Sequence, residues 1–303
     1  MDGFLNILKP PGMSSGAVVA VVKRLLKEKV GHAGTLDPEA AGVLPLMVGR
    51  ATRLLDYFSD KEKEYVAQLA FGCATDTQDA QGTVTETGER LPERAQIEAI
   101  LPSFTGEIMQ CPPAYSAIKL GGKPLYALAR QGELVQTQPR PVMIHGITLG
   151  DEAEKGIYVL TVRCGKGTYI RTLCHDLGQA LHCPAHMRFL LRTQSGPFRI
   201  EEAITLEELT EAVQHGEAQK MLLPPDYPLM QLRRIDIPQR LWKQAVNGVH
   251  LPAQAFSLED GEQARMYADH ELIGIAKRQN DELVFSVLLT GAVDFFERHQ
   301  AEK

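Results

Sequence analysis

The sequence predicts an α+β protein with a small β-rich module at its C-terminal end. Within the first 230 residues, some segments show strand-like apolar alternation or short apolar runs, and others show helical apolar spacing. A proline-rich stretch at 223–228 separates this part from about 75 residues in which short strands predominate. A chain of 303 residues is long enough for two domains, and we expect them at 1–230 and 231–303.

The N-terminal segment is predicted to form a strand, a turn and a helix. Residues 4–8 are a short apolar run that suits a buried strand, and Lys9-Pro10-Pro11-Gly12 is typical of a turn. Ser14 or Ser15 can cap the following helix, because a serine oxygen accepts hydrogen bonds from first-turn N–H groups. Apolar residues at helical spacing predict the helix itself: Val18, Val19, Val22, Leu25 and Leu26.

Later segments supply further strands and helices. Residues 63–71 alternate as a half-buried strand does, with Tyr65 on the same face as Ala67, Leu69 and Phe71. Helices are predicted at 92–101, where Pro92 opens the first turn, and at 168–181, where apolar residues recur at helical spacing. The other predicted elements are strands at 43–48, 141–149 and 158–164, a helix at 239–246, and strands at 264–268, 272–277 and 283–288.

Composition favours a soluble cytoplasmic protein. No run of about 18 apolar residues could span a membrane, and the N-terminus lacks the basic-then-apolar order of a secretory signal. The five cysteines are odd in number and widely spaced, so we expect reduced thiols rather than a disulfide framework.

The net charge of −6 argues against a nucleic-acid partner, but the charges are unevenly distributed. Residues 201–303 carry 18 acidic and 10 basic side chains, which leaves the rest of the chain slightly positive. Basic residues gather at 119–140 and 163–199, where they could contact phosphates. A solvated surface with uneven charge explains the same pattern, and the charges alone do not decide between the two.

Two groups of side chains suggest metal chemistry, but neither has the expected spacing. His175, His182, Cys183 and His186 are of ligand type, yet no standard zinc spacing is met, and we expect no metal site. Asp76 and Asp79 could act as paired acids. A polar turn that ends at Gly82 explains them more simply, so we expect the two residues to shape a loop.

Asp37 lies in a loop rich in glycine and alanine, between a basic helix end and an apolar strand. Pro38 follows it, and such a loop presents a carboxylate rigidly. Because Asp-Pro pairs initiate turns without any chemistry, the residues alone favour a turn-stabilising role for Asp37 over a catalytic one.

A series of sequence blocks alters that interpretation. They include Gly34-Thr35-Leu36-Asp37-Pro38, Lys63-Glu64-Tyr65 and Gly167-Thr168-Tyr169-Ile170-Arg171, and the full series lies at 8–15, 30–38, 42–45, 63–65, 75–82, 112–119 and 165–171. In identity and order these blocks resemble those of the TruB-type bacterial tRNA pseudouridine(55) synthases. The resemblance covers roughly residues 1–230, and the C-terminal module is loosely similar to a PUA-like RNA-binding domain.

The resemblance implies a pseudouridine-synthase-like fold, with a mixed, largely antiparallel sheet, flanking helices and an RNA-binding insertion at about 112–142. It also implies catalytic roles for Asp37, Tyr65 and Arg171. Asp37 would be the nucleophile, and Arg171 would hold the pKa of Asp37 low and fix its rotamer. The Tyr65 ring would stack on the extruded uracil, and its hydroxyl would accept a proton from the sugar.

Further roles follow from the same resemblance. Substrate-binding positions are His32, Tyr169, Leu190 and Lys9, and contacts to the RNA backbone are expected at Lys119, Lys123, Arg130, Arg140, Lys166 and Arg192. This chain departs from the family at Leu191, where relatives carry an arginine, so one such contact is expected to be absent.

The implied function is the isomerisation of uridine to pseudouridine at position 55 in the T-loop of tRNA, through base flipping. No cofactor, metal or protein partner is implied, and we expect a monomer that binds the T stem-loop. A non-enzymatic tRNA-folding chaperone with the same surface is the alternative, and a metal-dependent hydrolase built on Asp76 and Asp79 is a third hypothesis. The sequence leaves open whether Asp37 attacks the ring, attacks the sugar, or first takes a proton to give an unsaturated sugar.

Overall fold

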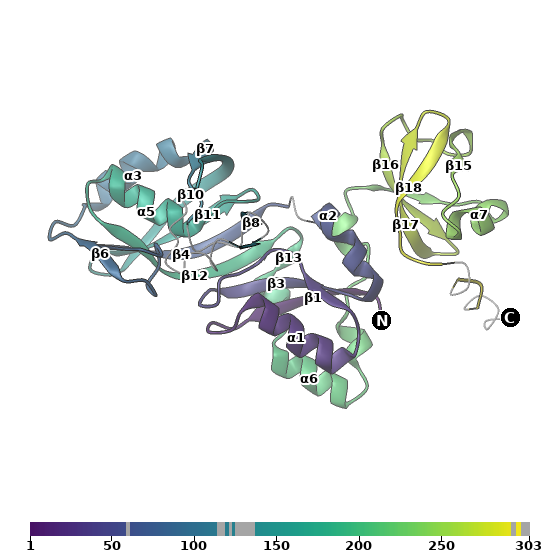
Figure 1. The fold of residues 1–303 in the computed structure, drawn as a ribbon, viewed down its shortest axis with the longest axis horizontal. Coiled ribbons are helices and arrows are strands. Elements are labelled where there is room, and N and C mark those ends of the chain that lie inside the picture. The colour runs from purple at the N-terminus through teal and green to yellow at the C-terminus, as the bar shows by residue number, and fades with distance from the viewer. Residues whose placement is uncertain (59–60, 114–118, 121–122, 125–136, 292–294, 298–303) are drawn as a thin grey trace.

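A computed structural model of the protein describes residues 1–58, 61–113, 119–120, 123–124, 137–291 and 295–297. Figure 1 shows a large sheet with helices packed on it and a smaller sheet at the C-terminal end. We propose that these two parts are two domains divided near residue 230. In the part of the chain that the structure describes, no helix is long and apolar enough to span a membrane.

The large sheet has nine strands in the order β1-β3-β12-β4-β11-β10-β7, with β2 paired to β3 and β13 paired to β12. Every neighbouring pair is antiparallel except β12 and β3, which are parallel. The predicted mixed, largely antiparallel sheet is therefore confirmed. The strands are β1 Gly3–Lys9, β2 Val30–His32, β3 Ala41–Val48, β4 Lys63–Phe71, β7 Gly106–Gln110, β10 Arg140–Glu154, β11 Ile157–Cys164, β12 Ala185–Ser195 and β13 Phe198–Arg199. Two short hairpins, β5 Cys73–Thr75 with β6 Val84–Thr87 and β8 Lys119–Leu120 with β9 Lys123–Pro124, lie outside it.

The central strand β12 was not predicted from the sequence. It joins the β1–β3 half of the sheet to the β4–β10 half, and it pairs with β3 on one side and β4 on the other. Its register on β4 shifts between Met187 and Phe189 and again between Arg192 and Gln194. Because each shift interrupts the two-residue period, apolar and polar residues do not alternate along β12 as they do along β4.

The helices match the predicted periodicity closely. Helix α1 spans Ser15–Leu26, and its N-cap is Ser14, whose hydroxyl accepts from the Ala17 N–H at 3.1 Å. Helices α3 (Arg94–Ile100) and α5 (Ile170–Ala180) lie within the segments predicted for them. Helix α6 (Leu206–Gln214), which was not predicted, packs against α1 on the β1 side, and two further short α-helices in the described residues are α2 Leu55–Phe58 and α7 Trp242–Val246.

The C-terminal sheet has five strands in the order β14-β16-β17-β18-β15. They are β14 Arg233–Asp236, β15 Leu251–Pro252, β16 Gln263–Ala268, β17 Glu271–Gln279 and β18 Glu282–Leu288, with a separate apolar core that includes Met266 and Ile273. Ile275 and Leu289 pack into a second cluster with Phe4, Phe58 and Phe198 of the larger part. Arg53 also donates from Nη1 to the Leu288 carbonyl at 2.7 Å, so apolar packing and hydrogen bonding both join the two parts.

Candidate active site

Asp37 lies in the loop 33–40 between β2 and β3, and helix α1 fixes the residue before it. The buried Ser15 hydroxyl donates to the Leu36 carbonyl and accepts from the Leu36 N–H, each at 2.9 Å. Of the two candidate capping serines, Ser14 caps the helix while Ser15 binds this loop. The first turn of α1 therefore determines where the Asp37 side chain begins.

Lys9 holds the other flank of the loop. Its side chain is fully buried, and its ammonium donates to the Pro38 carbonyl at 2.9 Å, to the Pro10 carbonyl at 2.8 Å and to the Met13 carbonyl. Burial lowers the pKa of Lys9 to about 8, while Glu39 and Asp37 act in the opposite direction. The expectation that Lys9 binds substrate is therefore corrected: its donors are used within the protein and it has no exposed surface.

Arg192 is also buried, contrary to the expectation that it contacts the RNA backbone. Only 1% of the residue is exposed, and its guanidinium donates from Nε to the Val43 carbonyl at 2.7 Å and from Nη2 to the Gly34 carbonyl at 3.0 Å. Gly42 makes this arrangement possible. It has φ of +110°, and a Cβ there would lie 2.2 Å from the Arg192 carbonyl oxygen, so β3 can approach β12 only with glycine at this position.

Arg171, the second residue of α5, lies directly beside Asp37. Its Nε is 3.0 Å from Asp37 Oδ2, and its Nη2 donates to Asp37 Oδ1 at 3.3 Å. The Arg171 Nη1 lies 3.5 Å from Asp79 Oδ2 and donates to the Thr77 carbonyl at 3.4 Å. The Arg171 side chain is 6% exposed and that of Asp37 is 39% exposed, so a buried cation orients a carboxylate that solvent can reach.

The resemblance implied that Arg171 holds the pKa of Asp37 low, but in the structure this pKa is raised. Burial raises the pKa above its ordinary value and Asp79 adds to the rise, while Arg171 and Lys9 act against it. The net effect is upward because the partial removal of the carboxylate from water outweighs the two cations. Arg171 thus fixes the geometry of Asp37 without making it an unusually strong acid.

Asp37 lines a cavity of about 290 Å³ together with six of the twelve other predicted site residues. Tyr65 from β4 and Leu190 from β12 are buried residues in its wall, and Tyr169 and Arg171 come from the start of α5. Burial raises the pKa of Tyr65, and the neighbouring Arg192 opposes that rise. The phenol of Tyr65 is therefore neutral near neutral pH, so it would act through its ring and hydroxyl.

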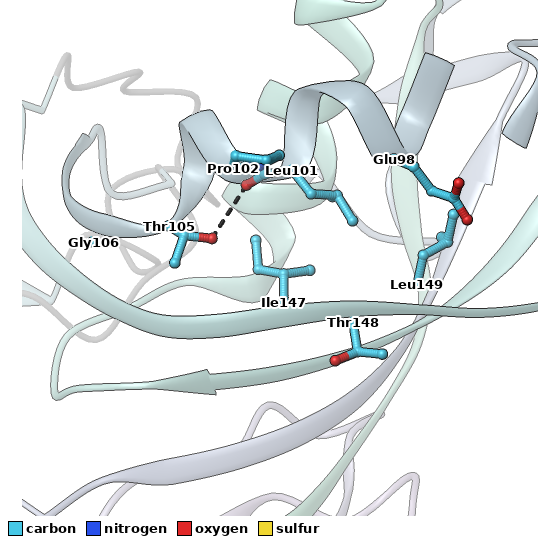
Figure 2. A pocket seen from close by; sticks show the side chains of 8 residues that line it. All are labelled: Glu98, Leu101, Pro102, Thr105, Gly106, Ile147, Thr148 and Leu149. Carbon is cyan, nitrogen blue, oxygen red and sulfur yellow. Dashed lines mark hydrogen bonds between the residues drawn. The ribbon is translucent and has the colours of Figure 1, made fainter. Parts of the chain in front are cut away.

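A larger hollow of about 710 Å³ lies elsewhere, between the α3 region and β10. Figure 2 shows Leu101, Pro102 and Ile147 facing it, with Glu98 at its edge. Glu98 is the single ionisable side chain in this lining and already pairs with Arg94, at 2.8 Å. We therefore place the chemistry at the smaller cavity, which contains converging charged groups.

Comparisons with known proteins agree with this geometry. Residues 23–170 match the N-terminal domain of TruB family pseudouridylate synthases, and residues 171–237 match the C-terminal domain of tRNA pseudouridylate synthase B. The chain is 43% identical over 282 residues to the tRNA pseudouridine synthase B of Heliobacterium modesticaldum, with 91% of this chain and 90% of that protein covered. This chain belongs to the TruB family. The corresponding protein of Symbiobacterium thermophilum is 47% identical over 253 residues, covering 82% of this chain and 83% of that protein.

Comparison with solved structures shows which fold this TruB-family enzyme has. A chain in the crystal structure of a Cbf5–Nop10–Gar1 complex superimposes with a TM-score of 0.74 and 27% identity, over 95% of this chain and 85% of that one. A chain in an H/ACA RNP bound to a substrate RNA containing 2′-deoxyuridine gives a TM-score of 0.72 and 25% identity, over the same fractions of the two chains. The recognition of the family and of a pseudouridine synthase fold is therefore confirmed.

Of the other predicted residues of the TruB-family site, only Lys166 lines its cavity among those that the structure describes, apart from Arg192. His32 is half-buried on β2 and does not line the cavity, and burial lowers its pKa, with Arg192 acting in the same direction. Lys166 is exposed on the cavity wall, and Arg140 is exposed at the start of β10. Lys119 and Lys123 lie in the β8–β9 hairpin, and Arg130 lies outside the described residues.

Two residues that support the site, Asp79 and Gln110, were not predicted from the sequence. Asp79 does help shape its loop, because its Oδ1 accepts from the Thr77 hydroxyl at 2.6 Å, but its second oxygen faces Arg171. Gln110, 1% exposed, accepts from the Tyr169 N–H at 3.0 Å and donates to the Tyr169 carbonyl at 3.2 Å. No sequence pattern singles out Gln110, because its burial and its contacts with Tyr169 arise only in the folded chain.

The metal hypothesis finds no support in the arrangement of side chains. Across the described ranges, no three His, Cys, Asp or Glu residues come together as a metal site. His186 lies with Nδ1 3.0 Å from the Cys73 carbonyl oxygen, and Asp76 accepts from the Thr83 N–H at 2.8 Å. His186 and Asp76 are thus engaged in their own local structure.

Proposed function

We propose that this enzyme converts uridine 55 in the T-loop of tRNA into pseudouridine, with Asp37 as the nucleophile. The observation that carries the proposal is the Asp37 carboxylate, bound at both oxygens by Arg171 and presented to a cavity lined by Tyr65 and Leu190. The choice of tRNA rests on the relatives, which are tRNA pseudouridine synthases B.

The reaction exchanges one glycosidic bond for another. The bond between N1 of uracil and C1′ breaks, the base turns, and a bond between C5 and C1′ forms. The proton on C5 is lost and N1 ends protonated, so atoms and electrons balance without an oxidant or reductant. A covalent bond to Asp37 would divide this exchange into two easier steps. Attack on the ring, attack on the sugar and initial proton removal all require the ionised carboxylate.

The dimensions of the cavity support base flipping. Its volume of about 290 Å³ is at the lower end of the range for ligand pockets, so it suits a single base rather than a helical segment. A base in a folded RNA arm can enter such a cavity only after it leaves its stack. The ring of Tyr65 offers a flat face and the side chain of Leu190 an apolar contact, against which the detached uracil can turn.

The test uses purified protein and one tRNA transcript labelled with tritium at C5 of uridine, because we propose that neither a cofactor nor a partner protein is needed. Tritium release reports pseudouridine formation, and mass spectrometry of nuclease fragments reports its position. Wild-type protein should release tritium from position 55, and a transcript with cytidine at that position should release none.

Asp37→Asn keeps the size of the side chain and removes its charge, so it should abolish release while filter binding of the transcript persists. Full activity of Asp37→Asn, or modification at another position, would contradict the proposal. Improved tRNA folding by a variant without activity would instead favour the chaperone alternative.

A further inference from the structure

A β-bulge in the central strand exposes an aromatic ring next to the active site. Met187 pairs with Leu69 and Phe189 pairs with Gln68, so Arg188 is an extra residue on β12. Arg188 and Phe189 are consecutive and both exposed. This is expected in a β-bulge, because the two residues lie opposite one residue of β4, Gln68, and so do not alternate between the faces of the sheet. Phe189 is 38% exposed, although a large apolar ring on a central strand is normally buried.

Phe189 borders a second hollow of about 140 Å³ beside Asp37. Asp37 and Leu190 line both this hollow and the 290 Å³ cavity, so the two spaces flank the same carboxylate. The other walls come from the Asp79 loop, from the bulge itself, and from Pro11, Glu39 and Ala40. A group bound in the second hollow would therefore adjoin a base held in the first.

Hydrogen bonds tie the bulge to the loop that supports Arg171. The Ala80 N–H donates to the Met187 carbonyl at 3.1 Å, and the Met187 N–H donates to the Gln78 carbonyl at 3.0 Å. Asp79 lies between these contacts and faces Arg171. The ring of Phe189 is thus carried on backbone that is fixed relative to Asp37, and such a rigid support suits a binding contact.

Charge and size indicate what the second hollow could hold. Asp37, Glu39 and Asp79 line it, and its exposed cation, Arg188, already pairs with Glu154 at 2.8 Å. Three carboxylates disfavour a phosphate group but can accept hydrogen bonds from N–H donors on a base. The volume is close to that of a cavity known to admit a benzene ring, so the hollow suits one ring and not a whole nucleotide.

We propose that Phe189 stacks on the nucleobase adjacent to the target uridine, and that the second hollow receives part of that base. This inference rests on the proposed function, because it assumes an RNA target base in the neighbouring cavity. Flipping a nucleotide leaves its neighbours without a stacking partner, and an exposed aromatic ring replaces that contact.

The test measures kcat/KM of Phe189→Ala on an RNA stem-loop with and without an abasic site on each side of the target. Loss of one base–aromatic stack should lower kcat/KM by roughly 5- to 150-fold, and Phe189→Tyr should retain most activity. Removing the stacked base should cost wild-type protein a similar factor and Phe189→Ala very little. Leu55→Ala, which truncates a side chain of similar exposure on α2, should behave as wild type.

The inference would be overturned if, on each side of the target, an abasic site lowered kcat/KM by the same factor in wild type and in Phe189→Ala. It would also be overturned if kcat/KM of Phe189→Ala on the intact stem-loop were within twofold of wild type. If thermal unfolding shows that Phe189→Ala is destabilised, Phe189→Leu keeps an apolar side chain without an aromatic face and gives the same comparison. A wild-type protein that forms no pseudouridine in the intact stem-loop would contradict the proposed function itself, a result distinct from either of these.

Discussion

The guanidinium of Arg171 contacts both carboxylate oxygens of Asp37, with Nε 3.0 Å from Oδ2 and Nη2 3.3 Å from Oδ1. Arg171 follows the first residue of α5, and Asp37 lies 134 positions earlier in the loop before β3. This two-point contact sets the rotamer of the proposed nucleophile, and a third nitrogen of the same guanidinium faces Asp79.

Arg171→Lys should slow catalysis much more than it weakens tRNA binding. A lysine ammonium is a point charge that cannot contact both oxygens of Asp37 in the planar geometry of arginine. A misplacement of the nucleophile by about 1 Å can cost about 10²-fold in rate, and we expect a loss of that order in the single-turnover rate. Arg24→Lys, at an exposed position of α1, is the matched control. Equal rates for the two variants would show that the contact does not orient Asp37.

The single-turnover rate should fall in acid at a higher pH than an ordinary aspartate would dictate. Burial, followed by the charge of Asp79, raises the pKa of Asp37 above 3.8. The ionised form that the reaction needs is therefore lost as the pH drops through this raised pKa. Asp79→Asn removes a like charge and should move the acidic limb of the pH–rate profile to lower pH. An acidic limb that moves to higher pH in Asp79→Asn, or that does not move, would contradict this account.

Lys9→Met should destabilise the fold and reduce activity together. The methionine fills much of the same space but leaves the Pro10, Met13 and Pro38 carbonyls without their shared donor. A buried polar group without a partner costs about 1–3 kcal/mol, so the loss in the free energy of unfolding should reach at least this range. Urea denaturation measures it. The exposed Lys23 gives the control, and Lys23→Met should leave stability within about 0.5 kcal/mol of wild type.

Gly42→Ala should be severely destabilising, while Gly16→Ala should not. A Cβ at Gly42 would lie 2.2 Å from the Arg192 carbonyl, and the φ of +110° is one that alanine rarely adopts. We expect a loss of at least about 2 kcal/mol in the free energy of unfolding, with separation of β3 from β12. Gly16 lies in α1 with open space around its Cα, so alanine there should be neutral or stabilising by up to about 1 kcal/mol. Similar stabilities for the two variants would refute the close-approach argument.

Much of the local structure followed from residue patterns. Strand β4 occupies the predicted 63–71, and Ser14 caps α1 as one of two expected serines. These features depend on neighbours a few positions away, because strand alternation and helix capping are short-range properties. The motif resemblance also paired Asp37 with Arg171, which the structure places in contact.

Residue patterns therefore predicted the kind of many regular elements, with β12 and α6 among the exceptions, and the sequence blocks identified the family to which the chain belongs. Only the tertiary structure decided the roles of Lys9, Asp79 and Arg192, and the direction of the pKa shift at Asp37. Lys9 meets the Pro38 carbonyl 29 positions away, and Arg192 meets that of Gly34 158 positions away. Whether a cation faces RNA or a set of buried carbonyls, and whether desolvation outweighs a neighbouring guanidinium, depends on atoms that only folding brings together.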